Sequence, residues 1–347
     1  MTTEGTQSPD DNVLLILPGY VQQDGSDSPS ALSDEEQRAN AEFLTGAYAA
    51  NTGIAYRSQL KAWANWCSQR AVSLREATGD ILVTYLRERA QGVKIGDRFH
   101  KPAKPNSLNV ACAAISKAYE LADLPDITKN TSVREALKSH RNRTARSGIR
   151  VRQAEALTAE SMAAIRATAL YPRRGRGGME TVGQARQRGL VDIAMIGLMR
   201  DCLLRRSEAA EVRWSHITKD SDGTGRLFVG VSKTDQEGEG ALLFISSQTM
   251  SDLSAIRPRN TDDQLVFGLH PRSIGRRIAA AARAAGEVGA FSGHSARVGM
   301  ARDLARAGEE LPALMTAGRW KGPEMVARYI AHERAGRGAV ARYHREP

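Results

Sequence analysis

The second half of the sequence brings cationic and hydrogen-bonding side chains together at helical spacing. In the segment 291–299, Phe-Ser-Gly-His-Ser-Ala-Arg-Val-Gly, His294 and Arg297 lie three residues apart where a helix is predicted to begin. Residues at this spacing share one face of a helix, and donors near a helix start suit a phosphate group. The motif therefore indicates an anion site, although His-x-x-Arg pairs also occur on ordinary helix surfaces.

Another cationic residue lies in an apolar setting. The segment 203–208, Leu-Leu-Arg-Arg-Ser-Glu, joins the end of one predicted helix to the start of the next. An arginine among apolar residues usually has a partner or a ligand, and Glu208 is placed to orient Arg205. One alternative is a purely structural Arg–Glu pair. Another is that Arg206 replaces Arg205 as the phosphate ligand, although the Leu-Leu-Arg register favours Arg205.

Three further residues complete a set that could carry out phosphoryl chemistry. Lys233 lies in a turn-forming segment between two apolar, β-branched runs, a pattern that predicts a β-hairpin. Trp320 precedes Gly322-Pro323, and proline at a first helical position predicts a helix that carries Tyr329. Taken alone, Tyr329 also fits an ordinary half-buried aromatic residue.

In chain order, these residues resemble the active-site set of the tyrosine recombinases, the phage integrase family. The resemblance is dense over the second half of the chain and sparse over the first, where a helix from Thr52 with Trp63 and Trp66 carries it. It implies an enzyme that cleaves and rejoins DNA strands. The catalytic residues that it implies are Tyr329, Arg205, Lys233, His294, Arg297, Trp320 and Glu208.

The resemblance also implies the route of the reaction. Tyr329 would attack the scissile phosphate, leaving a 3′-phosphotyrosyl enzyme and a free 5′-hydroxyl. Arg205 and Arg297 would bind the nonbridging oxygens, on which negative charge develops. Because the phosphotyrosyl bond retains the energy for rejoining, no ATP, metal or other cofactor is expected.

The remaining side chains would support this step. Lys233 would protonate the leaving oxygen as a general acid, and His294 and Trp320 would add hydrogen-bond donors. Glu208 would orient Arg205 or His294. Tyr343 is an alternative nucleophile, but its spacing does not fit, and the segment 339–343 looks like the last helix that such enzymes lend to a neighbouring subunit.

The pattern of apolar residues predicts a mainly α-helical chain. Helices are predicted over 33–49, 76–91, 106–122, 158–170 and 181–202, from Thr52 and Thr131, and over most of the chain after 247. Residues 226–232 and 241–246 predict the two strands of the hairpin, whereas 92–105 and 171–178 are predicted to be basic loops. The resemblance implies an N-terminal helical core-binding bundle, SAM-like, and a mostly helical catalytic domain with a small β-sheet, the tyrosine recombinase fold.

Composition and pattern together divide the chain into four parts. These are a disordered acidic tail over 1–32, a helical domain over 33–144, a basic linker over 145–157, and a second domain over 158–347. The resemblance implies that the first domain is the core-binding, DNA-binding domain and that the second is the catalytic domain, which ends in the exchanged helix.

The charge distribution points to a polyanionic partner. The chain has a formal net charge of +10, but residues 1–37 hold eight acidic residues and no lysine or arginine. The rest of the chain is therefore eight units more positive than the whole, at +18, which points to a polyanion such as nucleic acid, with a basic, solvated surface as the equal alternative. The resemblance implies that the helix starting near Pro271, with Arg272, Arg276 and Arg277, enters the major groove of DNA. The other candidate DNA-binding residues are Lys101, Lys104, Arg141 and Arg143. Arg272 is the best candidate for reading a base, although a phosphate contact is an alternative for each.

Other classes of protein are disfavoured by composition. No apolar run approaches the roughly 18–20 residues of a membrane span, and the short run at 13–18 lacks the basic start of a signal peptide. Three widely spaced cysteines form neither a disulfide framework nor a metal motif. A reducing bacterial cytoplasm, with the protein at the nucleoid, is the expected location.

The expected partner is double-stranded DNA with inverted-repeat target sites. A dimer would bind one site, two sites would be joined in a tetramer, and strand exchange would pass through a Holliday junction. Rivals with the same chemistry are a type IB topoisomerase and a telomere resolvase. A rival of another class is a helical DNA-binding regulator that has lost catalysis, although none of the implied catalytic residues is missing.

Overall fold

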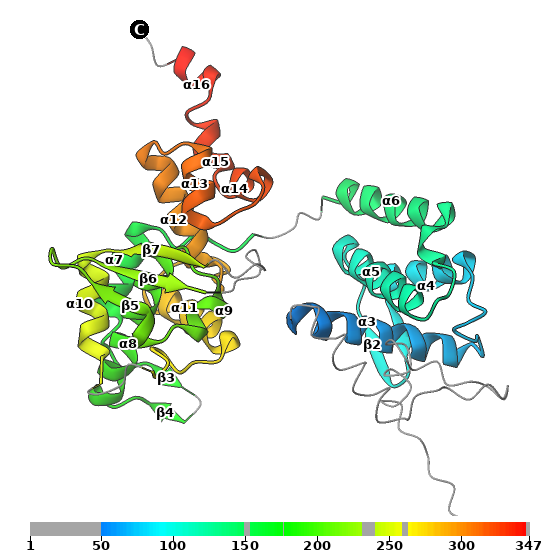
Figure 1. Cartoon of the computed structure of the whole chain (residues 1–347), viewed down its shortest axis with the longest axis horizontal. Coiled ribbons are helices and arrows are strands. Elements are labelled where there is room, and N and C mark those ends of the chain that lie inside the picture. Colours follow the sequence, from blue (N-terminus) through cyan, green and yellow to red (C-terminus); the bar gives the residue numbers. More distant parts are fainter. Residues whose placement is uncertain (1–49, 149–152, 176, 231–239, 259–262, 345–347) are drawn as a thin grey trace, which may run out of the picture. The chain divides into compact units, whose positions relative to one another are not determined.

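The computed structural model describes residues 50–148, 153–175, 177–230, 240–258 and 263–344 (Figure 1). The chain divides into two compact units between Val151 and Arg152. The predicted acidic tail, the helix predicted over 33–49 and Lys233 lie outside the described residues.

The first unit is a helical bundle built around two tryptophans. Its helices are α3 (Ala50–Gln69), α4 (Gly79–Gln91), α5 (Pro105–Leu121) and α6 (Thr131–Arg146), with a 3-10 turn at Ile127–Lys129. Trp63 and Trp66 lie on the buried face of α3, where their rings stack with centroids 5.6 Å apart, and Tyr85 of α4 packs edge-on against both. The helical bundle predicted for the first half is therefore confirmed.

Two segments that were predicted as loops contain short β-hairpins instead. The paired strands are β1 (Val93–Ile95) with β2 (Arg98–His100), and β3 (Arg174–Gly175) with β4 (Gly178–Met179). In the first hairpin, Gly92 with φ +93° and Gly96 with φ +58° adopt left-handed conformations that glycine tolerates best. Strands of two or three residues are too short for an alternating pattern to be recognised in the sequence.

The second unit is mostly helical and carries one three-stranded sheet. Its helices are α7 (Ala159–Thr168), α8 (Val182–Asp201), α9 (Arg206–Glu211), α10 (Ser247–Ile256), α11 (Pro271–Ala284), α12 (Ser295–Ala307), α13 (Leu311–Gly318), α14 (Pro323–Tyr329), α15 (Ala331–Ala335) and α16 (Ala339–Tyr343), with a 3-10 turn at Trp214–His216. The antiparallel sheet has the order β5 (Ile217–Lys219), β6 (Gly225–Val229), β7 (Ala241–Ile245). The predicted hairpin is confirmed as β6 and β7, whereas the edge strand β5 was not predicted.

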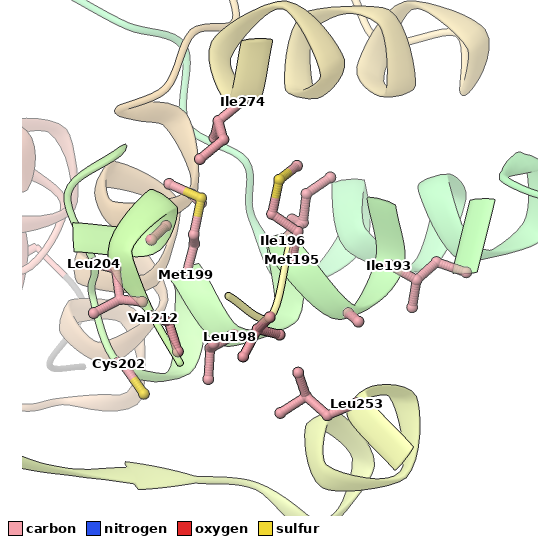
Figure 2. Packing of buried hydrophobic residues seen from close by; sticks show 14 of the residues in the cluster. Ile193, Met195, Ile196, Leu198, Met199, Cys202, Leu204, Val212, Leu253 and Ile274 are labelled. Atoms are coloured by element: carbon pink, nitrogen blue, oxygen red, sulfur yellow. The ribbon is translucent and has the colours of Figure 1, made fainter. Parts of the chain in front are cut away.

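Helix α8 runs through the centre of the second unit. Its residues are buried without interruption from Asp192 to Arg200, and Leu253 of α10 and Ile274 of α11 approach it from opposite sides (Figure 2). A helix that is enclosed on all sides fixes the turn that follows it, and this turn carries Arg205. Neither α8 nor any other helix in the described ranges is long and apolar enough to cross a bilayer.

The linker predicted over 145–157 is shorter than expected at both ends. Helix α6 continues to Arg146, and Leu157 is fully buried in the second unit, where its backbone N–H donates to the Ser295 carbonyl at 3.0 Å. The apolar side chain of Leu157 contributes to the core of that unit. The boundary therefore follows this apolar contact rather than the basic composition of the segment.

Candidate active site

The turn between α8 and α9 positions Arg205 and Glu208. Leu203 and Leu204 are buried in this turn, and Leu203 has φ +44°, so the chain reverses sharply before α9. The Glu208 carboxylate accepts a hydrogen bond from the Arg205 backbone N–H at 2.9 Å and another from Arg205 Nη1 at 2.5 Å. The predicted pair is thus present, and it fixes the orientation of the Arg205 guanidinium. Arg206, the alternative ligand, is exposed at the start of α9.

Arg297 lies in the first turn of α12 with only 3% of its surface exposed. Its guanidinium donates hydrogen bonds to the carbonyl oxygens of Leu203 and Gly318. Its Cζ lies 4.1 Å from the centroid of the Trp320 ring, which is a cation–π contact. One side chain therefore joins the turn after α8 to the end of α13 and to Trp320.

Tyr329 ends α14 and packs against Trp320. The two ring centroids are 6.0 Å apart and the ring planes meet at 63°, an edge-on arrangement. The Tyr329 phenol is also close enough to Arg297 to influence its pKa, which it raises. Arg297, Trp320 and Tyr329 thus form one continuous group, whereas the alternative nucleophile Tyr343 is 77% exposed and packs against His344.

The electrostatics of this group favour a bound anion. Burial, followed by the charge of Arg205, lowers the pKa of Arg297 below that of a free guanidinium. His294 is exposed, and partial desolvation, followed by the charges of Arg297 and Arg206, lowers its pKa. His294 is then a neutral donor at neutral pH, and an anion between the arginines would relieve their repulsion. No group of His, Cys, Asp or Glu that could hold a metal occurs within the described ranges.

The sequence analysis missed Arg319, which belongs to the same group. Its Nη2 lies 2.6 Å from Glu208 Oε2, so one carboxylate is shared by Arg205 and Arg319. Burial raises the pKa of Glu208, but the charge of Arg319 and the hydrogen bonds and charge of Arg205 lower it by more, and the carboxyl group stays ionised. The Gly-Arg-Trp sequence around Arg319 contains no signal for a partner so distant along the chain.

Comparison with known proteins decides the family. Residues 179–335 match the phage integrase family, and this stretch contains every residue of the group from Arg205 to Tyr329. The second unit therefore carries a domain of this family, the tyrosine recombinases. It is 31% identical over 131 residues to the recombinase Cre of Escherichia phage P1, a match that covers 38% of this chain and 34% of that relative. The match therefore spans about a third of the length of Cre.

Solved structures of a site-specific recombinase and of an integrase share the fold of this chain. The XerH site-specific recombinase, bound to palindromic difH substrate, aligns over 97% of both chains with a TM-score of 0.57 and 13% identity. Lambda integrase residues 75–356, bound to DNA, align over 86% of this chain and 94% of that chain, with a TM-score of 0.53 and 16% identity. At this identity the likeness concerns the fold alone, and it confirms the predicted fold class.

The predicted DNA-contacting residues fall into two groups. Exposed residues, which remain predictions, are Arg272 and Arg276 on α11 and Lys101, Lys104, Arg141 and Arg143 in the first unit. Arg277 is partly buried, since its Nε donates to Asp192 Oδ1 at 2.7 Å and its Nη2 to the Arg188 carbonyl at 2.9 Å, and its contact with DNA also remains a prediction. Asp192 is fully buried in α8 and requires a counter-charge there. Arg277 therefore fastens α11 to α8.

We expect inorganic phosphate to raise the melting temperature of this protein by binding to Arg205 and Arg297. At ten times the dissociation constant, a ligand that binds only the folded state adds about 1.4 kcal/mol, or about 4 °C for a unit of this size. The measurement is a thermal melt with sodium phosphate against sodium chloride of equal ionic strength. The same rise in an Arg205→Gln variant would contradict phosphate binding at this site.

Proposed function

We propose that this chain is a site-specific DNA recombinase that cleaves and rejoins strands through a phosphotyrosyl intermediate at Tyr329. The observation that carries the proposal is the contact of Tyr329 with Trp320, and of Trp320 with the buried Arg297. A nucleophile, a ring N–H donor and a cation are thereby held together. Arg205, fixed by Glu208, supplies a second guanidinium.

The proposed reaction is an exchange of phosphodiester bonds. The Tyr329 oxygen forms a bond to phosphorus while the bond to the 5′ oxygen breaks, and the phenol proton leaves to solvent or a nearby base. Arg205 and Arg297 stabilise the charge that develops on the nonbridging oxygens, and His294 and Trp320 each add one donor. Lys233, which lies outside the described residues, gives a proton to the leaving 5′ oxygen. Attack by a 5′-hydroxyl reverses these steps and reseals the strand.

The target site and the assembly that we propose for this chain are based on its relatives. Cre is a recombinase, and the XerH structure holds a palindromic substrate, which support inverted-repeat target sites for this chain. A dimer would occupy each site, and a tetramer would carry two sites through a Holliday junction. Such a protein would act in the cytoplasm, where the chromosomal DNA lies.

Replacing Tyr329 by phenylalanine is expected to abolish covalent attachment to DNA. The DNA is an inverted-repeat duplex that the full-length Tyr329→Phe protein selects from a random-sequence library. The selected duplex is then synthesised with a nick, so that the short fragment released by cleavage diffuses away and the strand cannot be rejoined. Wild type and Tyr343→Phe should form an adduct that survives SDS, and Tyr329→Phe should form none, because phenylalanine has no oxygen to attack phosphorus.

Two outcomes would contradict the proposal in different ways. An adduct that persists in Tyr329→Phe would move the nucleophile to another residue, and its loss in Tyr343→Phe would identify that residue. Tight binding without an adduct from any protein, wild type included, would favour the DNA-binding regulator.

A further inference from the structure

Arg319 combines an unusual backbone conformation with a buried side chain. It follows α13 with φ +53° and ψ +49°, the left-handed region in which glycine is the residue of least strain. A residue that merely ends a helix in this conformation is usually glycine, and its side chain is not needed. The Arg319 side chain, however, is only 13% exposed. The strain and the burial together indicate that the guanidinium has a role of its own.

The contacts of Arg319 connect it to Glu208 and, through Glu208, to Arg205. Its Nη2 donates to Glu208 Oε2 at 2.6 Å and its Nη1 to the Cys202 carbonyl at 3.3 Å. Its Nε is buried without a hydrogen-bond partner among the described residues. Arg319 thus shares Glu208 Oε2 with the Arg205 backbone N–H, whereas Oε1 accepts from the Arg205 guanidinium.

The charges around Glu208 make this sharing consequential. Arg205 faces the carboxylate from the turn before α9 and Arg319 faces it from the end of α13, and Arg297 of α12 acts on it at longer range. The Arg205 backbone N–H and Arg319 Nη2 both donate to Oε2, while the Arg205 guanidinium donates to Oε1. Arg319 therefore holds the carboxylate from the end of α13, and a carboxylate that cannot rotate holds the Arg205 guanidinium in one orientation.

We propose that Arg319 is a positioning residue for strand cleavage, which acts through Glu208 to hold Arg205 in place for the scissile phosphate. This inference rests on the proposed function. It assigns to the residue before Trp320 a part in the reaction, although Arg319 itself touches no reacting atom. Its positive charge also keeps Glu208 ionised, and an ionised Glu208 is the form that binds Arg205.

The pH dependence of cleavage separates this role from a structural one. Removal of the Arg319 charge takes away the largest of the influences that lower the Glu208 pKa, so the pKa rises. Glu208 then gains a proton at a higher pH than in the wild type and releases Arg205. The acidic limb of the pH–rate profile is therefore expected to move to higher pH.

The test compares Arg319→Gly and Arg319→Lys with the wild type in the nicked-DNA adduct assay, with the selected inverted repeat as the probe. Glycine removes the guanidinium and relieves the backbone strain, so the fold and the DNA affinity should be kept. The rate at which the Arg319→Gly protein forms the adduct at saturating DNA should fall about 100-fold, because a displacement of a catalytic group by about 1 Å has an effect of this size. Lysine should recover part of this rate and return the acidic limb toward its wild-type position, because it restores the charge beside Glu208.

A matched control is Arg166→Gln, which breaks the ion pair between Arg166 of α7 and Asp252 of α10. Neither residue belongs to the candidate active site. This variant should lower the melting temperature without moving the rate or the pH profile. An Arg319→Gly protein that cleaves within about threefold of the wild type, or more slowly with an unchanged pH profile, overturns the inference. A wild type without any adduct overturns the proposed function instead.

Discussion

We expect the Arg297→Lys protein to bind its DNA site but to cleave it about 1000-fold more slowly than the wild type. Arg297 donates to the Leu203 and Gly318 carbonyls and lies over the Trp320 ring, with its Cζ 4.1 Å from the ring centroid. An ammonium group has the same charge but neither the planar fork nor the reach to bond two carbonyls and a phosphate together. DNA affinity should change little, because the other phosphate contacts across a basic protein remain.

The measurements are the single-turnover rate of adduct formation and a DNA titration at fixed salt. Arg302→Lys is the matched control on the same helix, since Arg302 pairs with Glu333 at 2.6 Å and lysine can also make that pair. The control should cleave at nearly the wild-type rate. A rate for Arg297→Lys within tenfold of the wild type would mean that the charge alone, without the guanidinium geometry, is sufficient.

Local sequence patterns were enough to predict the elements that carry the site. His294 and Arg297 share a face because His294 immediately precedes α12, which begins at Ser295. Pro323 begins the helix that ends at Tyr329, as its fixed φ favours. These predictions succeeded because helix starts and spacing depend on neighbouring residues. The family resemblance added the order of the residues along the chain.

The features that the sequence did not predict depend on residues far apart in the chain. The resemblance places the helix of Arg277 in a DNA groove, and nothing in the sequence indicates the ion pair of Arg277 with Asp192, which lies on α8 and is fully buried. Arg319 was overlooked because a left-handed arginine has no sequence signature and its carboxylate partner is Glu208. In both cases burial decides the role of the charge, and burial is a property of the packed chain.

The Gly299→Ala substitution is expected to destabilise the second unit by about 3 kcal/mol, which corresponds to a fall of about 10 °C in melting temperature. Gly299 lies in α12 directly against the backbone of Leu157, and a Cβ atom there would lie 1.8 Å from the Leu157 carbonyl oxygen. That oxygen also accepts a hydrogen bond from Arg200, which is 7% exposed and bonded to Asp303. Relief of the clash therefore requires the chain at Leu157 to move away and leave part of a buried guanidinium without its partner.

Gly183→Ala is the matched comparison, because Gly183 is an exposed glycine in α8, and an added Cβ atom there would meet no described atom within 4 Å. Alanine favours a helix over glycine, so the free energy of unfolding of this protein should be about 0.5 kcal/mol higher than that of the wild type. Its melting temperature should therefore be slightly higher. Thermal melts of both proteins test the pair. If Gly299→Ala melted as high as Gly183→Ala, the close approach of α12 to Leu157 would be wrong. Two hydrogen bonds depend on this close approach: that of the Leu157 N–H to Ser295 and that of Arg200 to the Leu157 carbonyl. In that case these bonds would not join the start of the second unit to the helix that carries Arg297.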